Sequence, residues 1–220
     1  MNFENDFVKR GVFFILLGIF FIWLAKPVHA QQRFVWDVKL APADNDRSAD
    51  LMPADYLTVA GTVSDEDVIL AKRSILSQDT ELLQTFISGG GRFILCDAKN
   101  MWAYYMEDPF IENLSGYTLV GFIDYTQNVI YLLADKEHLY SSTTHELGHY
   151  LGHMLYKDYD TTDEWRSVRQ AEYRGSGLDT YYSDAEEFFA ESYAQYRTNP
   201  QYKRTCPIAC NTIKVLEDGI

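Results

Sequence analysis

The segment His145-Glu146-Leu147-Gly148-His149 constrains the fold of this chain more than any other part of its sequence. Residues four apart lie one above the other on a helix, so a helix here brings both imidazoles within reach of one zinc ion. Glu146 is turned by about 100° from His145, which places its carboxylate beside the metal rather than on it. The apolar spacing around this motif predicts a helix from Lys136 to about Tyr156.

A helix of this kind can support hydrolysis. Zinc lowers the pKa of a bound water molecule to about 7, and Glu146 can take its proton as the water attacks a carbonyl group. A third protein ligand is also needed. One group of zinc peptidases has a further His six residues beyond the motif, but that position is Leu155. His153 lies about 12 Å from His145 along a continuous helix, so we expect it to line the cleft or lie at the surface.

The carboxylate candidates for the third ligand lie in a second segment, Glu186-Glu187-Phe188-Phe189-Ala190-Glu191. Glu187 and Glu191 are four apart and share a helix face, so one can bind zinc while the other orients a ligand imidazole. Glu186 has no acidic residue four positions on. The neighbouring phenylalanines indicate a packed helix, where a buried carboxylate pair needs a partner such as a metal ion. We therefore assign Glu187 as the zinc ligand and Glu191 as the carboxylate that orients a ligand imidazole.

The first thirty residues have the order of a secretory signal peptide. Lys9 and Arg10 precede an uncharged run from Gly11 to Ala25, and Val28-His29-Ala30 is a small-x-small cleavage pattern. The run is shorter than the ~20 apolar residues of a stable membrane span. We expect cleavage after Ala30, secretion, and no stable membrane association afterwards. An uncleaved N-terminal membrane anchor is the alternative.

The formal net charge of −13 disfavours binding to nucleic acid, because affinity for a phosphate backbone comes from basic residues. Beyond the leader, the chain is long enough for one domain, or for two small lobes that share a cleft. We expect a monomer. The three cysteines are too few for a disulfide framework; Cys206 and Cys210 could close a small loop, or Cys96 and both of these could stay unpaired.

The order of expected elements is α+β. After an irregular lead-in at 31–55, one domain is expected over 56–220. Its expected parts, in order, are helices at 65–76 and 79–88, a buried strand at 92–96, a hairpin of Leu119–Ile123 and Val129–Leu133, the motif helix, a polar surface excursion at 157–182, a helix from Ser183 to about Arg197 and a last helix at 207–217. Ser183 and Glu186 are expected to form a capping box.

The motif helix, together with Glu187-Phe-Phe-Ala-Glu191 starting 38 residues after His149, resembles the zinc peptidases related to the catalytic domain of anthrax lethal factor. This family includes secreted Pro-Pro endopeptidases. A looser match through 82–96 and the hairpin extends the resemblance over most of 56–217. It implies a gluzincin-type zincin fold, with a small mixed sheet whose edge strand lies over the active-site helix and a mostly helical lobe after it. It also implies one catalytic Zn²⁺ on His145, His149 and Glu187, with Glu146 as general base.

The resemblance further implies a tyrosine whose hydroxyl stabilises the oxyanion. Tyr181 and Tyr182 lie six and five residues before Glu187, and Tyr181 is favoured. An edge strand should hold the substrate backbone, and the segment containing Val129 and Tyr131 is the candidate. Trp102, with its neighbouring tyrosines, would supply a hydrophobic wall or belong to the core.

We therefore expect a secreted zinc metalloendopeptidase that acts on protein or peptide substrates. The alternative is a secreted zinc-containing binding module, or toxin-accessory module, with little or no turnover. Hydrolysis of a non-peptide amide is a third reading of the same residues.

Overall fold

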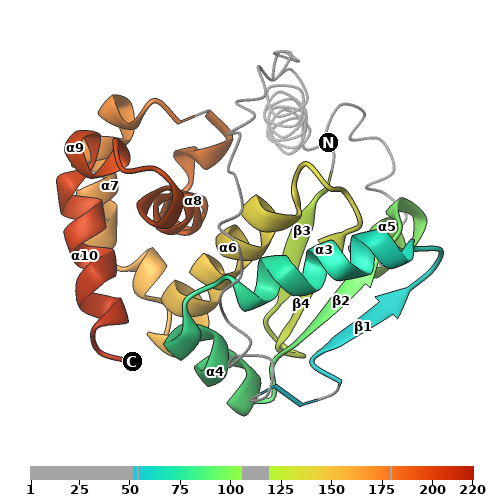
Figure 1. The fold of residues 1–220 in the computed structure, drawn as a ribbon. Helices are drawn as coiled ribbons and strands as arrows, with labels where there is room; N and C mark the ends of the chain where they lie inside the picture. The colour runs from blue at the N-terminus through green and yellow to red at the C-terminus, as the bar shows by residue number, and fades with distance from the viewer. Residues whose placement is uncertain (1–51, 54, 106–118, 179) are drawn as a thin grey trace, which may run out of the picture. The chain divides into compact units, whose positions relative to one another are not determined.

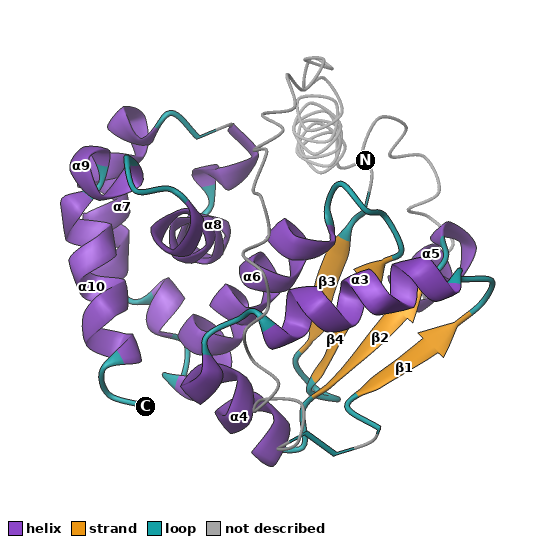
Figure 2. Ribbon diagram, in the orientation of Figure 1, coloured by secondary structure: helices purple, strands orange, loops and turns teal. Residues whose placement is uncertain are grey.

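The computed structural model describes residues 52–53, 55–105, 119–178 and 180–220, which form a mixed α+β fold (Figures 1 and 2). The expected leader at 1–30 and most of the lead-in lie outside the described residues. No described helix has the length and apolar character to cross a membrane. The elements in chain order are β1 Leu57–Ala60, α3 Asp65–Leu76, α4 Thr80–Ser88, β2 Arg92–Cys96, α5 Ala98–Tyr105, β3 Gly121–Asp124, β4 Val129–Leu133, α6 Leu139–His149, η2 Tyr150–Leu155, η3 Tyr159–Thr161, α7 Asp163–Ser176, η4 Thr180–Ser183, α8 Ala185–Thr198, α9 Tyr202–Thr205 and α10 Pro207–Glu217.

The described sheet has four strands in the order β1-β2-β4-β3. β1 pairs with β2, and β2 with β4, in parallel; β3 and β4 form the expected antiparallel hairpin. Asp124 fixes the turn, because its carboxylate accepts hydrogen bonds from the backbone N–H groups of Thr126 and Gln127 at 2.9 and 3.1 Å. The turn ends at Asn128 with a φ of 53°, a conformation that asparagine tolerates better than most residues.

The expectation that Val129–Leu133 forms the edge strand is wrong. This segment is β4, which pairs with β2 on one side and β3 on the other, so its backbone groups are already used. The apolar and almost fully buried run of β4 is typical of a central strand. The edge of the described sheet on this side is β3, Gly121–Asp124, whose residues are only half-buried. Hairpin order alone does not say which strand joins the rest of a sheet.

Alternate residues of the central strands serve two different faces. Phe93, Leu95, Ile130 and Leu132 point into the main core, which α3, α4 and α6 share. Cys96, Val129 and Tyr131 point to the other face, where Met101 of α5 covers them. This alternation is the period of two that a strand imposes on its side chains.

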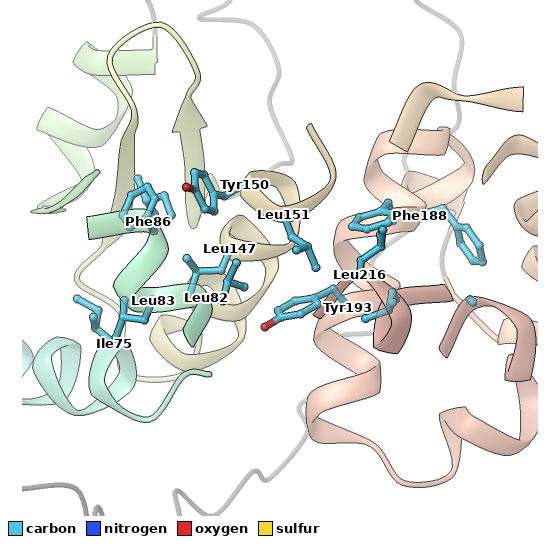
Figure 3. Packing of buried hydrophobic residues seen from close by; sticks show 14 of the residues in the cluster. Ile75, Leu82, Leu83, Phe86, Leu147, Tyr150, Leu151, Phe188, Tyr193 and Leu216 are labelled. Atoms are coloured by element: carbon cyan, nitrogen blue, oxygen red, sulfur yellow. The ribbon is translucent and has the colours of Figure 1, made fainter. Parts of the chain in front are cut away.

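Helix α6 lies between the sheet and the C-terminal helices, so its side chains pack against both within the main core (Figure 1). Figure 3 shows Leu147 and Leu151 between Leu82 of α4 on one side and Phe188 of α8 on the other. The expected helix at 136–156 is present with two differences: it begins at Leu139, and its last part, η2, winds as a π-helix.

The expected surface excursion at 157–182 is wrong, because most of it is helix α7. Trp165, Val168 and Glu172 are buried on one face of α7, and the Trp165 indole donates to the Ala185 carbonyl oxygen at 2.8 Å. The expected capping box at Ser183 is also wrong: Asp184 caps α8, its carboxylate accepting from the backbone N–H of Glu186 at 3.0 Å. The strand β1 and the helices α5 and α9 were not expected.

Cys96, Cys206 and Cys210 are all free and buried. Cys206 lies at the start of α10 and Cys210 one turn along it. Burial raises the pKa of the Cys210 thiol to about 11, as it does for Cys96. These thiols are therefore packed core groups in this structure, and no loop is closed between the last two.

Helix α10 begins on a buried carboxylate from α7. Both oxygens of Glu172 accept hydrogen bonds from the backbone N–H groups of Ile208 and Ala209, each at 2.8 Å. These donors belong to the first turn of α10, where no carbonyl of the same helix can reach them.

We expect Glu172→Ala to lower the free energy of unfolding by about 2–3 kcal/mol, because it removes two hydrogen bonds to a charged acceptor and leaves a buried donor unpaired. Chemical denaturation measures the change. The control is Glu66→Ala, whose carboxylate is 70% exposed and pairs with Lys136 at 2.7 Å; it should change stability by no more than about 0.5 kcal/mol. Equal losses in both variants would contradict this role of Glu172.

Candidate metal centre

His145, His149 and Glu187 converge from two helices. The two histidines lie on successive turns of α6, and Glu187 lies in the first turn of α8. The His145 Nε2 atom is 3.3 Å from Oε2 of Glu187, and the His149 Nε2 atom is 3.7 Å from its Oε1. The three ligand atoms all lie within 4.8 Å of one another. The structure thus brings together the three residues that the sequence singled out as ligands.

A glycine allows α6 and α8 to approach closely enough for this convergence. A Cβ atom at Gly148 would lie only 2.9 Å from the Cα and carbonyl oxygen of Ala190. The two residues before Ala190, Phe188 and Phe189, are fully buried and pack α8 against Trp165, whose ring lies 4.8 Å from that of Phe189. Gly148 is therefore needed for the close packing of α6 against α8.

Glu191 contacts the outer nitrogen of His145. Its Oε2 lies 3.2 Å from His145 Nδ1, and its Oε1 accepts a hydrogen bond from Gln195 Nε2 at 2.7 Å. A carboxylate at Nδ1 fixes the proton there, which leaves Nε2 free to face the cluster. This is the arrangement expected of Glu191 from the sequence.

Glu146 is buried beside the cluster. Burial raises the pKa of its carboxyl to about 7, with Glu187 adding to the rise and His145 opposing it. The start of β3 lies against it, because a Cβ atom at Gly121 would be 3.0 Å from the Glu146 Oε1 atom. A carboxyl with a pKa near neutrality can both accept and return a proton.

The two histidines sit in opposite electrostatic surroundings. Burial lowers the pKa of both imidazoles, and for His149 it lowers the value to about 3. For His145, hydrogen bonds with Glu187 and Glu191 outweigh burial and hold the pKa well above its usual value. Glu187 and Glu191 therefore favour positive charge at His145, whereas burial disfavours it at His149.

The donor set fits zinc. Two imidazoles and one carboxylate are ligands that a catalytic zinc site uses, and three protein ligands leave a fourth position open. The convergence of three such atoms within 4.8 Å supports the fit. His145, His149 and Glu187 would hold the ion.

Of the two tyrosine candidates, only Tyr182 can be placed. Its ring centroid lies 6.1 Å from that of His145. The backbone of Tyr181 belongs to η4, but its side chain lies outside what the structure describes.

The other expected substrate-contacting residues lie apart from the cluster. Val129 is fully buried, and Tyr131 stacks on Phe122 on the sheet face covered by α5. Trp102 belongs to α5, where its ring contacts Tyr105 at 6.1 Å. Among the described residues, no ring contact joins Trp102 to the two histidines.

His153 is on η2 and faces two carboxylates, with its Nε2 atom 3.2 Å from Asp158 and its Nδ1 atom 3.5 Å from Asp160. Tyr125, from the β3–β4 turn, stacks on His153 with ring centroids 4.1 Å apart. Burial, together with Asp160 and then Glu146, raises the pKa of Tyr125. Sequence reasoning missed Tyr125 and Asp160; an aromatic residue in a hairpin turn was the only available signal for the first.

The fold of this chain is similar to that of a solved structure. No protein-family model and no curated protein matches the chain. Among solved structures, the chain is similar to the Pro-Pro endopeptidase PPEP-2 from Paenibacillus alvei, with 19% sequence identity and a TM-score of 0.58. The similarity covers 73% of this chain and 97% of that one. The small mixed sheet and the helical lobe are therefore those of a Pro-Pro endopeptidase-like fold.

We expect Gly148→Ala to lower the free energy of unfolding by about 1–3 kcal/mol, because the added methyl group has no room between α6 and α8. Thermal and chemical denaturation measure this. Gly175→Ala in α7 is the matched control: a Cβ atom there meets nothing within 4 Å, so the variant should be neutral or up to about 1 kcal/mol more stable. A Gly148→Ala protein as stable as the control would show that the helices can separate without cost.

Proposed function

We propose that this protein is a secreted zinc-dependent metalloendopeptidase that acts on protein or peptide substrates as a monomer. The observation that carries the proposal is the convergence of His145, His149 and Glu187, with the buried Glu146 carboxyl beside them. The similarity of fold to a Pro-Pro endopeptidase supports a peptidase. The leader-like segment at 1–30 supports secretion.

Zinc, when bound, supplies a Lewis acid that polarises a carbonyl group and acidifies water. The protein residues do the rest. Glu146 accepts a proton from the attacking water and returns it to the leaving amine, which suits a carboxyl with a pKa of about 7. Glu191 keeps His145 in one tautomer through the 3.2 Å contact at Nδ1.

The outer edge of β3, which no other described strand pairs with, is the proposed place for the substrate backbone. An extended peptide can add a strand to an exposed sheet edge through main-chain hydrogen bonds. Gly121, the first residue of β3, lies against Glu146, so a peptide paired with this strand passes the general base. This assignment replaces Val129 and Tyr131 of the interior strand.

A tyrosine of η4 is proposed to donate a hydrogen bond to the oxyanion. Tyr182 is the candidate whose side chain the structure describes, and its ring lies 6.1 Å from that of His145. Oxyanion donors act on charge that appears only in the transition state, so they affect kcat more than substrate binding.

Glu146→Gln should keep the zinc content of the wild type and lower kcat by at least about 10²-fold, because the amide cannot accept the proton. Zinc per chain is measured by elemental analysis, and cleavage by mass spectrometry of a diverse peptide library with and without chelator. Glu187→Gln is the control and should lose one zinc per chain. Wild-type protein that holds zinc and cuts no peptide would instead favour the binding-module reading.

Tyr182→Phe and Tyr181→Phe form a matched pair that differs by one residue position. We expect the first to lower kcat by about 10²–10³-fold with little change in KM, and the second to stay close to wild type. The reverse result would move the oxyanion donor to Tyr181. Unchanged kcat in both variants would remove η4 from the mechanism.

A further inference from the structure

A second cluster of metal-ligating side chains lies beside the candidate zinc centre and shares no residue with it. It consists of His153 from η2, Asp160 from η3 and Glu186 from the first turn of α8. Each residue offers one ligand atom, and these atoms lie within 4.8 Å of one another. Three separate elements therefore converge on one point here, whereas two helices form the first centre.

Asp160 is the member that most needs a partner. Its side chain is fully buried, and among the described residues neither carboxylate oxygen has a hydrogen-bond partner. The His153 Nδ1 atom lies 3.5 Å from its Oδ1 atom and also lacks a hydrogen bond to a described residue. A buried carboxylate without donors is costly, and coordination of a metal ion is one of the few ways to satisfy it.

The surroundings of Asp160 point the same way. Burial raises the pKa of its carboxyl; His153 opposes this rise, and Glu186 adds to it by its negative charge. The two carboxylates of Asp160 and Glu186 repel each other, and a cation between them would remove this repulsion. The stacked ring of Tyr125 covers His153 from the side of the β3–β4 turn.

We propose that His153, Asp160 and Glu186 bind a second divalent transition-metal ion, with zinc as the best match. An imidazole nitrogen with two carboxylate oxygens is a zinc-type ligand set, whereas Ca²⁺ and Mg²⁺ take oxygen ligands. The two carboxylates balance the charge of the ion. Three protein ligands leave room for one water molecule to complete a tetrahedron.

The role of this ion is structural. The chain between η2 and η3 passes through two left-handed residues, Lys157 and Asp158, with φ values of 50° and 63°. An ion held by His153 and Asp160 fastens both ends of this strained turn. Because Glu186 directly precedes Glu187, the same ion also fixes the first turn of α8, which carries the third ligand of the other centre.

The test uses the full-length protein and Zn²⁺ alone, with zinc per chain measured by elemental analysis after desalting. We expect two zinc ions in the wild type and one in Asp160→Asn. His145→Ala removes a ligand of the first centre only, so it should retain one zinc, and added zinc should raise its melting temperature. The double variant His145→Ala/Asp160→Asn should bind none and show no such rise.

The matched control is Asp158→Asn. Its carboxylate also contacts His153, at 3.2 Å, but is 65% exposed and belongs to no ligand cluster, so two zinc ions should remain. If Asp160→Asn does not fold, the half-buried Glu186→Gln variant replaces it. A His145→Ala protein that binds no zinc would overturn the second site and leave the proposed peptidase function intact. A wild type with one zinc, retained in His145→Ala and lost in Asp160→Asn, would support the second site and overturn the first.

Discussion

The close packing of α6 against α8 is the constraint on which the rest of the site depends. Gly148 leaves no side chain between the helices, and Ala190 meets it from the other side. Gly152 continues the contact one turn later, where a Cβ atom would lie 2.8 Å from the Phe189 ring. Side chains from both helices therefore reach the same small volume. Any change that widens this contact moves Glu187 away from both histidines.

This packing also concentrates negative charge in the interior. Glu146, Glu187 and Glu191 lie around His145. Asp160 and Glu186 lie beside His153. Buried carboxylates are costly unless they find cations or hydrogen-bond donors. Gln195 and the histidine nitrogens satisfy part of this demand. A metal ion at the proposed sites would balance the remaining negative charge. The stability of the helical lobe would then depend on metal binding.

Sequence reasoning succeeded where the signals are local. Ser64 and Asp79 accept hydrogen bonds from the first turns of α3 and α4, the two helices predicted at 65–76 and 79–88. The motif spacing predicted that the two histidines lie close together, and the four-residue spacing of Glu187 and Glu191 predicted that they share a helix face; Glu187 does lie next to both histidines. These features need only neighbours along one helix.

Sequence reasoning failed where the outcome depends on distant partners. β1 is four residues long and exists because it pairs with β2, more than thirty residues later. The identity of the edge strand depends on which hairpin strand reaches β2. Helix α7 has polar residues on most of its surface, so only the spacing of Trp165, Val168 and Glu172 marked its buried face. Asp160 has no motif around it, and its burial follows from η2, η3 and α8 meeting.

The position of β3 at one edge of the sheet, as the described residues form it, has a consequence for aggregation. An unpaired strand edge is a template for another copy of the same chain, and proteins limit this hazard by keeping such strands short. β3 has four residues, with a glycine at one end and a charged aspartate at the other. A bound extended ligand would cover the same backbone groups. Binding of such a ligand would therefore also protect the protein from self-association through β3.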